Sequence, residues 1–288
     1  MSNPSTGPRA LGASHAREVR EGQRFEFGRN WRAFLDVLDD RRIARAEASL
    51  AAMLGVESLR GRTFLDVGCG SGLFSLAARR LGATVRSFDY DPMSVACAAE
   101  LKRRYFENDP RWTIEEGSAL DAAFLHRLGS FDIVYSWGVL HHTGAMWQAL
   151  ANVDALVGPA GQLFIALYND QGRSSRYWWH VKKAYVGLPR YLRFIVLVPS
   201  FVRLWAPTLL RDLLRGKPLA TWRARSEDRG MSPYRDVIDW VGGFPFEVCK
   251  PEQVFEFFKH RGYELQRLKT SAGGIACNEF VFARRAAS

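Results

Sequence analysis

Three glycines that alternate with small residues follow a short apolar run in the segment FLDVGCGSGL, residues 64–73. Gly68, Gly70 and Gly72 can adopt backbone conformations that other residues rarely reach, and they let a bound molecule approach the main chain closely. In an open parallel sheet, ligands lie beyond the carboxyl ends of the strands. A glycine turn directly after a strand is therefore a predicted binding position.

The spacing of these glycines differs from that of a dinucleotide-binding loop. Such a loop reads G-x-G-x-x-G and places a pyrophosphate on a helix N-terminus. Here the spacing is G-x-G-x-G, and Leu73 stands at the place of the third dinucleotide glycine. Asp66 immediately precedes the turn, and its carboxylate would repel a pyrophosphate and attract a cationic group. The turn is predicted to hold a ligand with positive charge.

A second acid follows the next apolar run, which ends in SFDYDP. Asp89 lies 17 residues after Gly72, about where a ribose-binding carboxylate belongs. Its two oxygens can accept from the two hydroxyls of a ribose, and the ring of Tyr90 can stack on a purine. These positions favour a nucleoside ligand.

The elements that position these residues alternate between strand and helix patterns. We expect strands at 63–67, 84–88, 112–115, 131–136 and 162–167, and helices from about 71, over 92–105 and over 146–156. A helix over 251–261 and strands at 263–268 and 279–283 follow a long insertion after Tyr168. This alternation predicts an α/β fold with a mostly parallel sheet covered on both faces.

At DVGCGSG, FDYDP and FDIVYSWGVLHH the chain resembles the class I S-adenosylmethionine-dependent methyltransferases. It is most similar to the small-molecule enzymes, including the quinone O-methyltransferases. The resemblance covers roughly Leu59 to Leu167, and more loosely Lys250 to Arg284. It implies a Rossmann-like seven-stranded sheet with one antiparallel strand, and S-adenosyl-L-methionine as the cofactor.

The resemblance also implies which residues contact the cofactor. Asp66 and the glycine turn would hold its amino acid end, and Asp89 its ribose. The other expected contacts lie after later strands or in an N-terminal lid: Tyr90, Ser118, Ala119, Ser136, Trp137, Gly138 and Trp31, the last beside Asn30. Many relatives have an acid where Ser118 stands, so Asp121 is an alternative partner for the adenine amine. The alternative for Trp31 is simple packing on the sheet.

Methyl transfer needs a nucleophile held close to the activated methyl group, and a base only where that nucleophile has a proton to lose. His141 and His142 follow the fourth strand, so one of them is the first candidate for the base. His142 matches a histidine common in relatives, often with a structural role, so His141 is expected to be the freer one. Tyr168 and Asp170, after the fifth strand, are further candidates, and Asp170 alternatively caps the next helix.

Three polar residues are predicted on the substrate side. Asn169 follows the fifth strand, and Glu247 lies in WVGGFPFEV at 240–248, a loop expected to return to the site. Asn278 opens the last strand. A plain turn packed on the core is the alternative for 240–248, and a strand-end hydrogen bond is the alternative for Asn278.

The net charge of +10 is a local property. Residues 173–225 contain twelve Lys or Arg, nine aromatic residues and one acid, Asp212, which gives +11 there and about −1 elsewhere. Arginines and prolines interrupt its most apolar stretch, so a membrane span is not expected. The segment is either a cap over a small-molecule pocket, a peripheral element on anionic lipid that admits a lipidic substrate, or an RNA-binding surface. RNA is least favoured, because no known RNA-binding module accompanies it.

We therefore expect a disordered tail at 1–22, a helical cap at 23–58, a methyltransferase core at 59–170 and 241–288, and a basic helical insertion at 171–240. The predicted activity is methyl transfer to a small molecule, preferably at a hydroxyl. An RNA methyltransferase and a non-catalytic cofactor-binding protein are the alternatives. Scattered cysteines and the lack of metal-ligand spacing predict a reduced cytoplasmic protein without a metal. The acceptor and the oligomeric state stay open.

Overall fold

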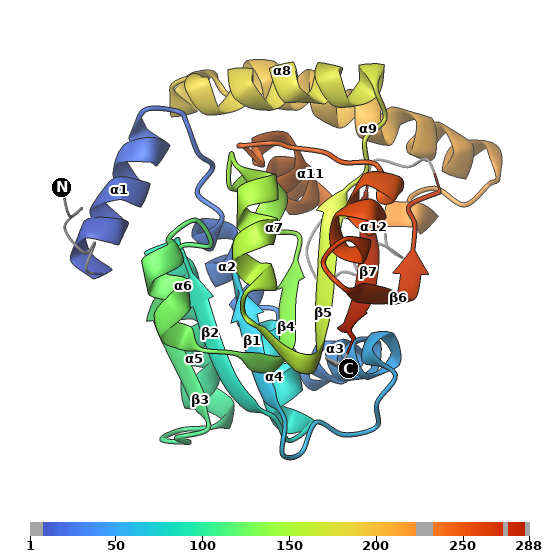
Figure 1. The fold of residues 1–288 in the computed structure, drawn as a ribbon. Coiled ribbons are helices and arrows are strands. Elements are labelled where there is room, and N and C mark those ends of the chain that lie inside the picture. Colours follow the sequence, from blue (N-terminus) through green and yellow to red (C-terminus); the bar gives the residue numbers. More distant parts are fainter. Residues whose placement is uncertain (1–7, 223–232, 273–275, 286–288) are drawn as a thin grey trace.

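The computed structural model describes residues 8–222, 233–272 and 276–285 (Figure 1). Its centre is a seven-stranded sheet in the order β3-β2-β1-β4-β5-β7-β6. The strands are β1 Thr63–Val67, β2 Thr84–Asp89, β3 Trp112–Glu116, β4 Phe131–Trp137, β5 Val157–Tyr168, β6 Tyr263–Lys269 and β7 Cys277–Arg284. Strands β1 to β5 pair in parallel, and β7 runs antiparallel to both neighbours. The predicted fold class is confirmed.

Helices cover both faces of the sheet, each over its own apolar cluster. On one face lie α3 Asp40–Leu54, α4 Leu73–Arg80 and α5 Pro92–Tyr105. On the other lie α6 Ala122–Leu128, α7 Met146–Asp154 and α12 Pro251–Lys259. The N-terminal segment forms α1 Pro8–Arg20 and α2 Gly28–Leu35, and short 3-10 turns occur at Leu140–His142 and Arg190–Leu192.

Local sequence explains why these elements form where they do. The β1 segment TFLDV is buried along most of its length, as expected for a strand covered on both faces. Helix α5 begins at Pro92, and Asp91 caps it by accepting a hydrogen bond from the Met93 N–H at 2.9 Å. The parallel register places Val67 beside Phe88, so the glycine turn and Asp89 emerge at the same edge of the sheet.

Gly72 brings α4 close to α5. Its φ is +81°, in the left-handed region that favours glycine, and an added Cβ would lie 2.8 Å from the Ala98 Cα. A side chain at this position would therefore strain the backbone and also push α5 away.

We expect Gly72→Ala to lower the free energy of unfolding by about 1–3 kcal/mol more than Gly262→Ala, because only the first adds an overpacked contact. Gly262 has nearly the same φ, +79°, with open space around its missing side chain, so it controls for backbone strain. Urea unfolding of both variants provides the comparison. Equal losses would mean that the contact with α5 is unimportant.

The N-terminal segment differs from the predicted disordered tail at 1–22. Residues 8–20 form α1, in which Leu11 and His15 are buried, while residues 1–7 lie outside the described ranges. The Glu18 carboxylate accepts from Tyr90 Oη and from Arg24 Nε, each at 2.7 Å. The prediction was wrong for 8–20 because distant partners order a segment whose own composition is polar.

The insertion forms a further layer over the carboxyl ends of the parallel strands (Figure 1). It consists of α8 Arg173–Gly187, α9 Phe194–Leu214 and α11 Pro233–Gly242, and its residues 223–232 lie outside the described ranges. The inner sides of these helices share an apolar cluster that includes Trp178, Trp205 and Val241. By length and composition alone, Arg190–Leu214 is apolar enough to cross a membrane.

Candidate functional site

A cavity of about 740 Å³ lies at the carboxyl ends of β1, β2 and β4. Its walls come from the glycine turn after β1, from the N-terminal segment around α2, and from α11 of the insertion. The volume is in the range of pockets that hold cofactors and drug-sized molecules. Helices α2 and α11, which are distant from each other in the sequence, thus enclose the edge of the sheet where these strands end.

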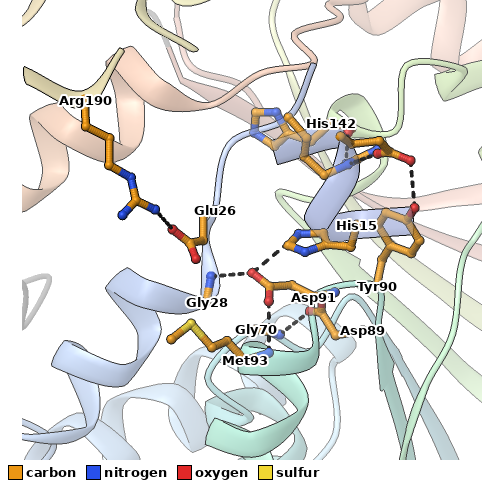
Figure 2. Close-up of polar contacts among 12 residues, drawn as sticks. His15, Glu26, Gly28, Gly70, Asp89, Tyr90, Asp91, Met93, His142 and Arg190 are labelled. Atoms are coloured by element: carbon orange, nitrogen blue, oxygen red, sulfur yellow. Dashed lines mark hydrogen bonds and ion pairs between the residues drawn. The ribbon is translucent and has the colours of Figure 1, made fainter. Parts of the chain in front are cut away.

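The glycine turn is hydrogen-bonded to Asp89 at the end of β2 (Figure 2). Asp89 Oδ2 accepts from the Gly70 N–H and Oδ1 accepts from the Asp91 N–H, both at 2.9 Å. A carboxylate has about four acceptor positions, so each oxygen keeps a lone pair for a ligand. Burial raises the pKa of Asp89 to about 6. This carboxylate therefore offers two acceptors to a pair of neighbouring hydroxyls.

Two of the three glycines face the cavity. Gly68 and Gly70 have φ of +76° and +54° and belong to its lining. A Cβ on Gly70 would lie 3.0 Å from the Trp31 indole, so this ring from α2 lies directly over the turn. Gly72 is not among the lining residues; it faces α5, as described above.

Asp66 reaches the cavity below the turn although it is only 2% exposed. One of its oxygens accepts from Ser75 Oγ at 2.5 Å. Burial, with a smaller contribution from the charge of Asp89, raises the pKa of Asp66 to about 7. A nearby positive charge stabilises such a carboxylate in its ionised form, so this end of the cavity is complementary to a cationic group.

The remaining predicted cofactor residues divide into two groups. Those that line the cavity are Tyr90, Ser118, Ala119, Trp137 and Gly138. Ser136 does not line it; the residue is buried and its hydroxyl donates to the Val67 carbonyl at 3.0 Å. Asp121, the alternative to Ser118, caps α6 by accepting from the Phe124 N–H.

Polar contacts connect α1 to two sides of the cavity (Figure 2). Tyr90 Oη donates to Glu18, and Arg24 Nε donates to the same carboxylate. Arg24 Nη1 also donates to the His142 carbonyl at 2.8 Å. His15, another lining residue, lies 3.7 Å from Asp91. The N-terminal segment is therefore part of the cavity wall.

The environments of the two histidines are the reverse of those predicted. His141 is fully buried outside the lining, and its ring lies 3.9 Å from that of Tyr168. His142 lines the cavity and donates from Nδ1 to the Pro245 carbonyl at 2.6 Å, which leaves Nε2 as an acceptor. The expectation that His141 is the freer residue was wrong. Burial holds the pKa of His141 well below its usual value and lowers that of His142 to about 3.

Tyr168 and Asp170 also separate. The Tyr168 side chain lines the cavity among aromatic rings that include His142, Trp240 and Phe246. Asp170 lies outside this cavity and accepts from the Gly172 N–H at 2.8 Å, directly before α8. Its contact fits the structural alternative of a turn or cap.

A carboxylate of the insertion faces the same cavity. Asp239 of α11 lines it, and the Asn30 amide of α2 donates to Asp239 Oδ1. Burial raises the pKa of Asp239 to about 7. Nearby, the fully buried Lys182 ammonium donates to the Trp240 carbonyl and lies 4.0 Å from the centre of the Trp240 ring. Burial lowers the pKa of Lys182 far below its usual value.

Comparison with known proteins decides the family. Residues 65–163, from β1 into β5, match the family described as "Methyltransferase domain". That segment contains the glycine turn and Asp89. The order of its strands in the sheet places both beside the cavity. Residues 65–163 of this chain form a class I S-adenosylmethionine-dependent methyltransferase domain.

Relatives of this methyltransferase domain agree with that assignment. Ubiquinone biosynthesis O-methyltransferases of Escherichia fergusonii and Escherichia coli are 32% and 31% identical over 139 residues, or 48% of this chain. The chain spans about half the length of these curated relatives, 53% in both cases.

Solved structures support the fold of the methyltransferase. Magnesium protoporphyrin IX methyltransferase from Synechocystis, determined with bound SAH, has a TM-score of 0.51 at 14% identity, over 96% of this chain and 97% of that one. PKMT2 from Rickettsia typhi, in complex with AdoHcy, has a TM-score of 0.52 at 14% identity, over 83% of this chain and 52% of that one.

The residues predicted on the substrate side lie outside the lining of the methyltransferase cavity. Asn278 is buried; its amide donates to Asn169 Oδ1 at 3.1 Å and its oxygen accepts from the Ser271 N–H. Glu247 accepts from the Met146 N–H at 3.0 Å and caps α7. Asn169 and Asn278 thus join the end of β5 to β7, and Glu247 holds the start of α7.

Sequence reasoning missed the part of the cavity wall that the insertion provides. Asp239 and Trp240 belong to α11, and the sequence gives no strand-end signal for them. Asn30, next to Trp31 in the expected lid, is the hydrogen-bond partner of Asp239. The sequence around Asp239, PYRDVIDW, contains a second acid, Asp236, and gives no pattern that singles out Asp239.

Proposed function

We propose that this chain is a cytoplasmic S-adenosylmethionine-dependent O-methyltransferase that acts on a small, largely apolar molecule with a hydroxyl group. The observation on which the proposal rests is that one cavity joins Asp89 and the glycine turn to Asp239 on α11. The curated relatives are O-methyltransferases by name, which supports the same chemistry. Four free cysteines agree with a reducing compartment.

The residues at the β1–β2 end of the cavity fit the cofactor. Asp89 has two free acceptor positions for the ribose hydroxyls, and Asp66 provides a carboxylate for the ammonium end. Ser118 and Ala119, with the buried Phe88, would border the adenine. When bound, S-adenosylmethionine supplies a methyl group that its sulfonium activates toward attack.

The opposite end of the cavity suits an aromatic or aliphatic acceptor. Phe27, Tyr168 and Trp240 give it apolar walls, and Asp239 and His142 are polar residues beside them. Apolar walls exclude water and orient an acceptor by shape, while a small number of polar atoms select its hydroxyl. We infer that Asp239 and His142 are those polar groups.

Asp239 is the group that we assign to the proton of the acceptor. A carboxylate whose pKa is about 7 is partly ionised near neutral pH, and a base works best when its pKa lies near the operating pH. The Asn30 amide fixes one carboxylate oxygen, which leaves the other for the hydroxyl. His142, with Nδ1 committed to Pro245, can only accept at Nε2 and would orient the acceptor.

Calorimetry with S-adenosylhomocysteine, followed by transfer of a labelled methyl group to a set of catechols, phenols and prenylated phenols, tests the proposal. We expect saturable heat in the calorimeter. We also expect labelled product that remains after amine products have been removed. Binding of S-adenosylhomocysteine without transfer to any hydroxyl acceptor would favour a non-catalytic cofactor-binding protein. Absence of binding would contradict the assignment of the cavity.

A further inference from the structure

Helix α9 exposes an apolar face that the rest of the described chain does not cover. Ile195, Val198, Val202, Leu210 and Leu213 are between 54% and 63% exposed. Their spacing of three, four, eight and three residues places them on one side of a helix. Apolar side chains at this density on a surface mark a contact with a partner or a membrane.

The opposite side of α9 is packed against the protein. Trp205 is 3% exposed and its ring lies 4.7 Å from that of Trp222. Ser200 and Asp212 on the same inner side are also buried, and Asp212 accepts from the Thr221 hydroxyl and N–H. Because one side is fixed to the insertion and Pro199 and Pro207 interrupt the helix, α9 suits a position along a bilayer surface better than one across it.

The charges around this face identify the partner. Residues 190–217 contain six Lys or Arg, and their single acid, Asp212, is buried and hydrogen-bonded. Arg203 is exposed with its guanidinium over the Tyr177 ring of α8, and Arg211, Arg215 and Lys217 are exposed around the C-terminal end of α9. A second copy of the chain would bring the same cations against one another, whereas anionic lipid headgroups neutralise them.

We propose that the α9 face binds the surface of an anionic lipid bilayer, with its aliphatic side chains in the headgroup region and its flanking cations on lipid phosphates. Helix α9 packs on α11, whose Asp239 and Trp240 line the cavity (Figure 1). Bilayer binding would therefore bring the acceptor side of the cavity to within one helix layer of the lipid.

Sedimentation of the full chain with vesicles tests this surface without any need for methyl transfer, so its failure is distinct from a failure of the proposed activity. Phosphatidylcholine vesicles with added phosphatidylglycerol are expected to bind the protein, and pure phosphatidylcholine vesicles much less. The double variant Val198→Glu/Val202→Glu should lose more than about tenfold in vesicle affinity. Val37→Glu is the matched control, because Val37 is 46% exposed far from α9 in the sequence.

A second pair of variants tests the cations. Arg211→Gln and Arg215→Gln should each weaken binding to the anionic vesicles by about fivefold, and added salt should have a similar effect. Unchanged circular dichroism would establish that the variants fold. The proposal is wrong if the Val198→Glu/Val202→Glu variant binds vesicles like the Val37→Glu control. It is also wrong if the wild-type chain is a dimer that this variant makes monomeric, or if it ignores vesicles and binds RNA instead.

Discussion

Asp89→Ala is expected to weaken binding of S-adenosylhomocysteine by at least about 100-fold, because two hydrogen bonds to a charged acceptor are lost together. The same substitution removes the acceptor of the Gly70 N–H and so loosens the turn beside the cofactor. Isothermal titration calorimetry measures the change. This effect should exceed that of any other single change at the cofactor end of the cavity.

Ser136→Ala provides the control for this measurement. Resemblance implied a cofactor contact for Ser136, yet its hydroxyl is directed to the Val67 carbonyl outside the cavity lining. We expect the affinity of the Ser136→Ala variant for S-adenosylhomocysteine to stay within about twofold of the wild type, since no hydrogen bond to the ligand is lost. A large loss in Ser136→Ala with little change in Asp89→Ala would place the cofactor elsewhere.

Asp239→Asn is expected to slow methyl transfer by about 100- to 10,000-fold, the usual contribution of a general base, while S-adenosylhomocysteine binds as before. The amide has the shape of the carboxylate and can still accept from the Asn30 amide, so the packing of α11 on α2 is retained. Single-turnover transfer from labelled cofactor separates the chemical step from binding. Asp170→Asn, outside the cavity, should keep the wild-type rate.

The pH dependence gives an independent readout of Asp239. Its pKa is raised to about 7, and only the ionised carboxylate can accept a proton. The wild-type rate should therefore rise with pH and level off above about 7, and the residual rate of Asp239→Asn should lack this rise. This measurement should run from about pH 5 to about pH 9, which brackets the pKa by about two units on each side. A wild-type rate that is flat over this range would mean that Asp239 is not the base.

The sequence allowed the sheet and the cofactor end to be predicted because their signals are local. A strand, a glycine turn and an acid at the end of the next strand lie within 26 residues of one another, from 64 to 89. Parallel pairing then brings strand ends to one edge without further information. Asp66, Gly68, Gly70 and Asp89 all reach the cavity for this reason.

The acceptor end could not be predicted because its contacts join distant parts of the chain. Asn30 and Asp239 are 209 residues apart, and no periodic pattern connects α2 to α11. The roles of His141 and His142 depend on which of these adjacent side chains faces the cavity. The distant loop that provides the Pro245 carbonyl fixes the orientation of His142. The helix at 8–20 was missed because Tyr90 and Arg24 order it through Glu18.

The strand order has a consequence for how the chain matures during synthesis. β7 lies between β5 and β6, although it is the last described strand in the chain. A nascent polypeptide that ends before Cys277 leaves the long, apolar β5 with an unprotected hydrogen-bonding edge, which other chains can join. A chaperone or a fused solubilising partner should therefore help most in the interval before this strand emerges from the ribosome, when the edge of β5 is unpaired.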